Sequence, residues 1–126
     1  MPVAHVTFGS ADLDRGGRFY DAVIAEFGGS RTIDAERSKG WGFPEGGPSI
    51  GICHPFDGQP ANVGNGTMFA LMAKDEDQVR RVHAAALGNG GSCEGAPGLR
   101  PNGFYAAYFR DPDGNKLNTF CFPTES

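Results

Sequence analysis

The stretch YAAYFRDPDGNKLNTFC, residues 105–121, carries a turn signal between two segments that favour strands. The turn signal is DPDGN, residues 111–115, because Asp, Pro, Gly and Asn are the residues that tight turns prefer. The aromatic and alternating residues on either side are typical of β-strands. The stretch therefore predicts a β-hairpin, with strands over residues 103–110 and 116–122.

This hairpin is the last part of the second of two repeats, because the sequence repeats with a shift of half its 126 residues. HVTFGSADLDRGGRFYDAVIAEFG, residues 5–28, aligns without a gap with MFALMAKDEDQVRRVHAAALGNGG, residues 68–91. Each segment has a strand, an Asp that can cap a helix (Asp12 or Asp75), apolar positions at helical spacing and terminal glycines. The recurrence of these signals in the same order indicates an internal duplication.

The duplication predicts a single domain over residues 1–126, made of one module over about residues 1–60 and a second over about residues 61–126. Each module has the order strand, helix, three strands. Beyond the aligned segments and the hairpin, further strands are expected over residues 31–36, 41–43 and 49–54, and near residue 92. The predicted fold class is α+β, with two βαβββ modules related by pseudo-twofold symmetry. One face of each curled mixed sheet packs on its helix, and the faces left over are expected to form a groove.

Strand alternation predicts which side chains face this groove. Four positions are equivalent under the duplication, namely His5, Gly51, Met68 and Asn118. The same alternation adds Thr7 and Phe120. Aromatic residues suit the walls of a ligand pocket and Arg100 can close its entrance, so the full set of candidate binding residues is His5, Thr7, Trp41, Gly51, Met68, Arg100, Tyr105, Asn118 and Phe120.

Composition narrows the class of partner. The net charge is −4 and Lys and Arg do not cluster, so neither nucleic acid nor an anionic membrane is an expected partner. A neutral or cationic small molecule fits better. No apolar run is long enough to span a membrane and no signal peptide is apparent, so a cytoplasmic location is expected. The three cysteines are widely spaced and lack a zinc pattern, which predicts reduced, mostly buried thiols.

The combined motifs resemble the vicinal oxygen chelate superfamily, which holds glyoxalase I, bleomycin-resistance proteins and extradiol dioxygenases. The motifs are HVTFGSADLDRGGRFYDAV (residues 5–23), PFDGQPANVGNGT (55–67), HAAALGNGG (83–91) and YAAYFRDPDGNKLNTFC (105–121). The resemblance spans nearly the whole chain and implies the glyoxalase-like fold. It leaves the reaction open, because the superfamily supports isomerisation, epoxide opening, ring cleavage and plain sequestration.

The resemblance also implies where a metal would bind. Members with metal chemistry place His or Glu at the four equivalent positions, and the side chains hold a divalent ion. Here His5 is retained, whereas the other three positions are Gly51, Met68 and Asn118. One imidazole is too few for a catalytic Zn²⁺ site, and an amide supplies neither charge nor a general base. We therefore expect no cofactor or bound metal, with His5 the one retained candidate.

Four functions follow from this pattern. The first is a superfamily member with a degenerate metal site that binds a small molecule in the groove, to sequester it or to process it without metal. The second is a metal-dependent lyase, isomerase or dioxygenase with unusual ligands, and the third is a drug-sequestering resistance protein. The fourth is a structural or partner-binding module. Catalytic residues stay unassigned and an enzyme is one outcome among several. A homodimer is expected, and the groove forms either within one chain or by pairing modules of two chains.

Overall fold

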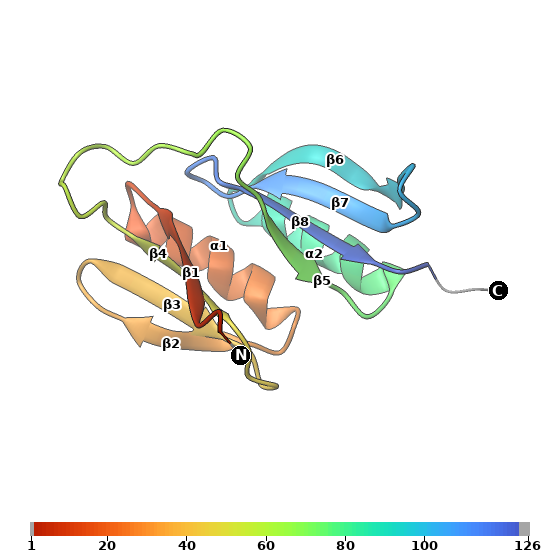
Figure 1. Ribbon diagram of the computed structural model, residues 1–126, viewed down its shortest axis with the longest axis horizontal. Coiled ribbons are helices and arrows are strands. Elements are labelled where there is room, and N and C mark those ends of the chain that lie inside the picture. Colours follow the sequence, from red (N-terminus) through yellow and green to blue (C-terminus); the bar gives the residue numbers. More distant parts are fainter. Residues whose placement is uncertain (1, 124–126) are drawn as a thin grey trace.

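Two four-stranded mixed sheets, each backed by one helix, make up the fold in the computed structural model, which describes residues 2–123 (Figure 1). The first module contains β1 (His5–Gly9), α1 (Leu13–Ala25), β2 (Ser30–Asp34), β3 (Ser38–Gly42) and β4 (Ser49–Cys53). The second contains β5 (Phe69–Met72), α2 (Glu76–Gly88), β6 (Ser92–Leu99), β7 (Tyr105–Arg110) and β8 (Lys116–Cys121). The predicted pair of βαβββ modules is confirmed.

Both sheets have the same topology. The strand orders are β1-β4-β3-β2 and β5-β8-β7-β6, and in each sheet the first and last strands of the module pair in parallel while the other pairs are antiparallel. The sheets remain separate and do not close into a barrel. The third strand begins earlier than expected, at Ser38, and the strand expected near residue 92 extends to Leu99 through two register shifts.

The helices begin where the capping residues predict. The Asp12 side chain accepts a hydrogen bond from the Arg15 amide at 3.0 Å, and the Asp75 side chain accepts one from the Gln78 amide at 2.8 Å. These bonds satisfy amides that have no partner inside the helix. None of the helices in residues 2–123 is long and apolar enough to cross a membrane.

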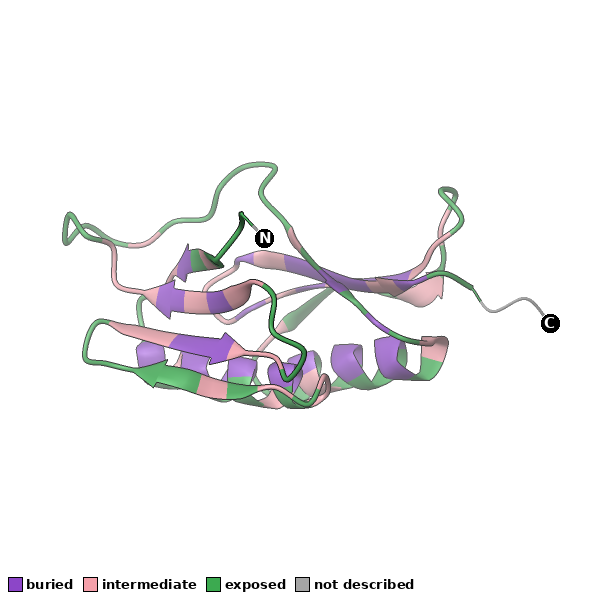
Figure 2. Ribbon diagram, turned by 60° about the horizontal axis from the view of Figure 1, so that its bottom comes forward, coloured by how far each residue is buried: buried purple, intermediate pink, exposed green. Residues whose placement is uncertain are grey.

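The apolar core is continuous between the two modules. The ring centroids of Phe8 and Phe69 are 6.1 Å apart, and those of Phe19 and Phe109 are 6.2 Å apart, each pair joining the first module to the second. The helices also contact each other, and their buried surfaces face the sheets (Figure 2). Burial of these aromatic side chains stabilises the packing of the two modules against each other.

A polar network fastens the β7–β8 hairpin to the first module. The Tyr20 hydroxyl donates to Asp111 Oδ2 at 2.8 Å, the Asn115 side-chain amide donates to the Gly9 carbonyl at 3.0 Å, and Arg15 pairs with Asp113 at 2.9 Å. The DPDGN turn therefore does more than reverse the chain, since its side chains also hold the two modules together.

Candidate functional site

The open face of the first sheet carries three of the predicted binding residues. His5 and Thr7 are exposed on β1, and Gly51 lies beside Thr7 on β4. A cavity of about 180 Å³ lies over this face, and its lining includes all three residues together with Ile33 and Gly40. All residues that line this cavity belong to the first sheet.

The open face of the second sheet carries Asn118. In the strand register Asn118 lies between Ala70 of β5 and Tyr108 of β7. Only 6% of Asn118 is exposed, and its side-chain oxygen Oδ1 is buried without a hydrogen-bond partner among the described residues. A buried oxygen without a donor lowers stability. Asn118 therefore holds an unpaired acceptor beneath the open face.

Aromatic rings also lie on this face. Phe104 and Phe120 have ring centroids 5.1 Å apart, and Phe122 packs against both. The Tyr108 ring lies under two cations, with the Arg100 guanidinium 5.3 Å and the Lys116 ammonium 5.5 Å from its centroid. Local charge at Tyr108 is therefore positive, although the net charge of the chain is −4. Sequence analysis did not single out Tyr108 and Lys116. Alternation from Asn118 places Lys116 on this face, and the register of β7 with β8 adds Tyr108.

Two predicted binding residues lie on the other side of their sheets. Trp41 is fully buried under α1, where its indole nitrogen donates to Asp21 at 2.8 Å and its ring packs on Tyr20. The reason is register, because Trp41 pairs with Ile50, whose side chain is in the core. Tyr105 faces α2 in the same way, and its hydroxyl accepts a hydrogen bond from Arg80 at 2.9 Å. Neither side chain faces the open faces.

Arg100 and Met68 lie at the edges of the second open face. The Arg100 guanidinium donates to the carbonyls of Ala96 and Gly98, at 2.7 and 2.9 Å, so the side chain is fixed above Tyr108. Met68 directly precedes β5 and is half exposed. Of the nine predicted binding residues, the structure thus places three on the first open face and four on or beside the second.

The open faces lie on the same side of the molecule, opposite the helices, and do not face each other (Figures 1 and 2). Among the described residues, the strands of one module pair with one another and not with those of the other module. His5 and Gly51 therefore stay on one sheet, and Met68 and Asn118 on the other. A single chain therefore carries two separate open faces.

The side chains at the four equivalent positions do not fit a divalent metal. They offer one imidazole, one thioether and one amide, whereas Zn²⁺ sites need about three strong ligands and harder ions need carboxylates. Gly51 leaves little room for a replacement, because a Cβ there would lie 3.2 Å from the Lys39 carbonyl oxygen. Within residues 2–123, no three His, Cys, Asp or Glu side chains are grouped to hold an ion.

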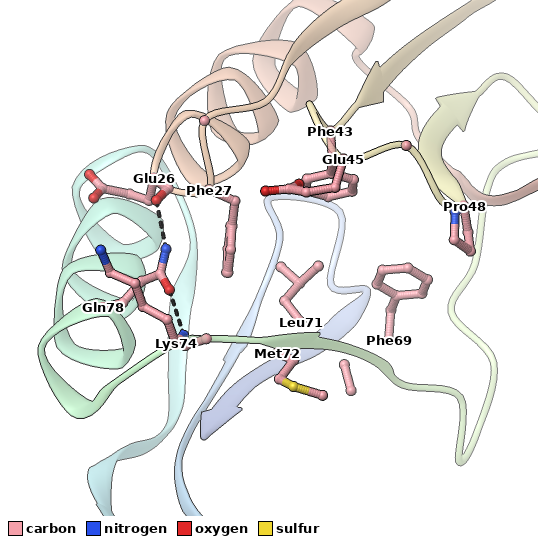
Figure 3. Close-up of a pocket in the computed structure, with 14 residues that line it drawn as sticks. Glu26, Phe27, Phe43, Glu45, Pro48, Phe69, Leu71, Met72, Lys74 and Gln78 are labelled. Carbon is pink, nitrogen blue, oxygen red and sulfur yellow. Dashed lines mark hydrogen bonds between the residues drawn. The ribbon is translucent and has the colours of Figure 1, made fainter. Parts of the chain in front are cut away.

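A cavity of about 790 Å³ lies between the modules (Figure 3). Phe27 and Phe43 of the first module form one wall and Phe69 of the second forms another, with Glu26 and Glu45 near the first wall. Ala70 and Met72 of β5 also line it, and the register places both on the open face beside Asn118 and Phe120. This cavity was not predicted, because it requires the free edge of β5 to lie beside the loop after β3.

Comparison with known proteins identifies the class. The sequence profile of the Glyoxalase/Bleomycin resistance protein/Dioxygenase superfamily matches residues 3–119. A glyoxalase/bleomycin resistance protein from Albidiferax ferrireducens T118 has a similar structure, with a TM-score of 0.88, 36% identity, and coverage of 98% of this chain and 100% of that chain. No curated protein sequence matched the chain.

More distant structures share the fold. A glyoxalase-related enzyme from Fulvimarina pelagi has a TM-score of 0.79 at 21% identity, covering 96% of this chain and 88% of that one. A lactoylglutathione lyase from Agrobacterium tumefaciens has a TM-score of 0.69 at 19% identity, covering 94% and 92%. The chain belongs to the glyoxalase/bleomycin resistance protein/dioxygenase superfamily, as the sequence motifs predicted.

Proposed function

We propose that this protein binds a small, mainly apolar molecule on the open faces of its sheets, without a metal ion. The buried, unpartnered Oδ1 of Asn118 is the observation that carries the proposal. Once the Asn118 side chain turns toward the open face, a ligand with an N–H or O–H group would satisfy this oxygen. The ring cluster of Phe104, Phe120 and Phe122 would pack against the apolar part of the ligand.

The complete groove lies between two copies of the chain in this proposal. The first open face of one copy would cover the second open face of its partner and so bring His5 and Asn118 into one site. Large apolar side chains that a single chain leaves exposed support the pairing, since Ile33 lies on the first open face and Met72 and Phe122 on the second. Covering such side chains is the usual source of stability in a homodimer.

Calorimetric titration with paired ligands tests the role of Asn118. Anilides have an N–H donor, and the corresponding N-methylanilides lack it. We expect the wild-type protein to bind an anilide about 3- to 10-fold more tightly than its N-methyl analogue, as one hydrogen bond would give. Asn118→Leu should abolish that difference, and Asn62→Leu, in an exposed loop, should retain it. An unchanged preference in Asn118→Leu would place the ligand elsewhere.

Metal loading tests the second part of the proposal. The protein is loaded with Zn²⁺, Ni²⁺, Mn²⁺ or Fe²⁺, desalted and measured by elemental analysis beside His5→Ala. We expect no stoichiometric metal in either protein. Retention of about one ion per chain that is lost in His5→Ala would favour a metal-dependent lyase, isomerase or dioxygenase instead. Saturable binding of a cationic antibiotic would favour a drug-sequestering role.

A further inference from the structure

Cys93 and His83 form a contact on the side of the second sheet that α2 covers. The distance between Cys93 Sγ and His83 Nε2 is 3.3 Å, within hydrogen-bond range for sulfur. Cys93 is on β6 opposite Phe109 of β7, and the His83 ring packs edge-on against Phe109 with centroids 6.5 Å apart. Strand register and helix packing together bring the thiol and the imidazole into contact.

The two partners differ in exposure. Cys93 is an exposed residue at the edge of the sheet, whereas His83 is only 9% exposed. Burial lowers the pKa of His83 below its usual value, which keeps the imidazole neutral near pH 7. A neutral imidazole nitrogen accepts a proton, and a thiol must lose one before it attacks.

The other two cysteines lack this arrangement. Cys121 is buried, and burial raises the pKa of its thiol. Cys53 is half-buried on β4, and no histidine contact is found for it among the described residues. The charged neighbours of Cys93, Glu94 and Arg110, form an ion pair with each other at 2.6 Å. His83 is thus the base that faces the Cys93 sulfur.

We propose that Cys93 is a modification site, a base-assisted thiol that exchanges with low-molecular-weight disulfides. Cys93 Sγ attacks one sulfur of the disulfide while its proton passes to His83 Nε2. The disulfide S–S bond breaks and a mixed disulfide forms on Cys93. The departing thiolate takes the proton from the imidazolium, so one disulfide and one protein thiol give one mixed disulfide and one free thiol. The site lies on the opposite face of the sheet from Asn118, so it is independent of the proposed ligand binding.

The reaction of the reduced, full-length protein with 5,5′-dithiobis(2-nitrobenzoate) tests this proposal. Absorbance gives the rates and mass spectrometry gives the fraction modified at each cysteine. At pH 7 we expect Cys93 to react at least about tenfold faster than Cys53 or Cys121. His83→Gln keeps a polar side chain without a base, and it should slow Cys93 about tenfold at pH 7 but little at pH 9.5, where thiols ionise unaided.

Two results would overturn the assignment, namely equal rates at Cys53 and Cys93, or an unchanged Cys93 rate in His83→Gln. Circular dichroism verifies that this variant folds. If it does not, the pH–rate profile of Cys93 in the wild-type protein decides. As the pH falls to 6.5, the rate of a base-assisted Cys93 should decrease less than the rate of Cys53 in the same molecule. Rates of Cys93 and Cys53 that decrease in parallel would reject the proposal.

Discussion

Asn118 carries a side-chain oxygen whose burial needs an explanation. Its oxygen is buried and unpartnered on the open face, while its neighbour Thr119 is buried toward α2 with its own hydroxyl unpartnered. Buried polar atoms are nearly always paired in folded proteins, so each exception requires a reason. For Asn118, the proposed reason is a ligand.

Replacing Asn118 by Leu, which is similar in shape, should therefore raise the free energy of unfolding of the ligand-free protein by about 1 kcal/mol. The gain comes from removing an amide oxygen that has no donor. Urea denaturation followed by circular dichroism measures it. A loss of stability of similar size would mean that the amide makes a stabilising bond, through water for example, and that the acceptor is not free.

Two glycines near the end of α2 differ in the space available for a side chain. A Cβ on Gly91 would lie 2.7 Å from the carbonyl oxygens of Ala86 and Arg110, whereas a Cβ on Gly88 would meet no atom within 4 Å. We expect Gly91→Ala to lower the free energy of unfolding by roughly 1–3 kcal/mol. Gly88→Ala, in the last turn of the helix, should raise it by about 0.5–1 kcal/mol. Thermal and urea unfolding of the matched pair measure both, and a destabilised Gly88→Ala would contradict the open space seen there.

At the scale of elements, the β7–β8 hairpin is held by Asp111. This carboxylate accepts hydrogen bonds from the Tyr20 hydroxyl and from the backbone amides of Asp113 and Asn115. Tyr20→Phe removes the link to α1 and should lower the free energy of unfolding by roughly 2 kcal/mol, the size of a hydrogen bond to a charged group. Urea denaturation measures this loss. Tyr108→Phe, which removes a tyrosine hydroxyl on the open face, is the control for the buried hydrogen bond of Tyr20. Equal effects would show that the bond contributes nothing specific.

The pH dependence of stability tests the same hairpin. Burial raises the pKa of Asp111, and its hydrogen bonds offset this only in part. The folded state then holds the Asp111 proton more tightly than the unfolded state, whose carboxyl has a pKa of about 3.9. This contribution to stability is complete below that pH and is lost as pH rises through the higher folded pKa.

The stability of the wild-type protein relative to Asp111→Asn should therefore fall as pH rises from about 3.5 to 6. Urea titrations of both proteins across this range provide the measurement, and effects of the other carboxylates cancel in the difference. A relative stability that rises with pH would show that hydrogen bonding to the carboxylate outweighs its burial.

At the scale of the whole molecule, the open faces leave apolar side chains in water. Met72 is 63% exposed on the second open face, whereas Leu87, also exposed, lies on α2. We expect light scattering to give the mass of a dimer at micromolar concentration. Met72→Glu should weaken the dimer at least about tenfold, since it places a charge in an apolar contact, and Leu87→Glu should not. A monomeric mass for the wild-type protein would contradict the proposal that the groove forms between two copies of the chain.

The features that could be predicted from the sequence are those that depend on local signals. The caps at Asp12 and Asp75, the DPDGN turn and the order of strands and helices follow from residues that are neighbours in the chain. Alternation placed His5 and Asn118 on open faces because consecutive side chains of a strand point to opposite sides. It was not applied to the third strand of each module, so Trp41 and Tyr105 were expected in the groove although their strand partners face the core.

The sequence by itself determined the superfamily, the two βαβββ modules and which residues occupy the four equivalent positions. Only the tertiary structure decided that the two open faces lie apart, that the Tyr20 hydroxyl donates to Asp111, 91 residues away, and that Cys93 contacts His83. Capping, turns and alternation depend on near neighbours, whereas these contacts depend on how the two helices pack the modules against each other.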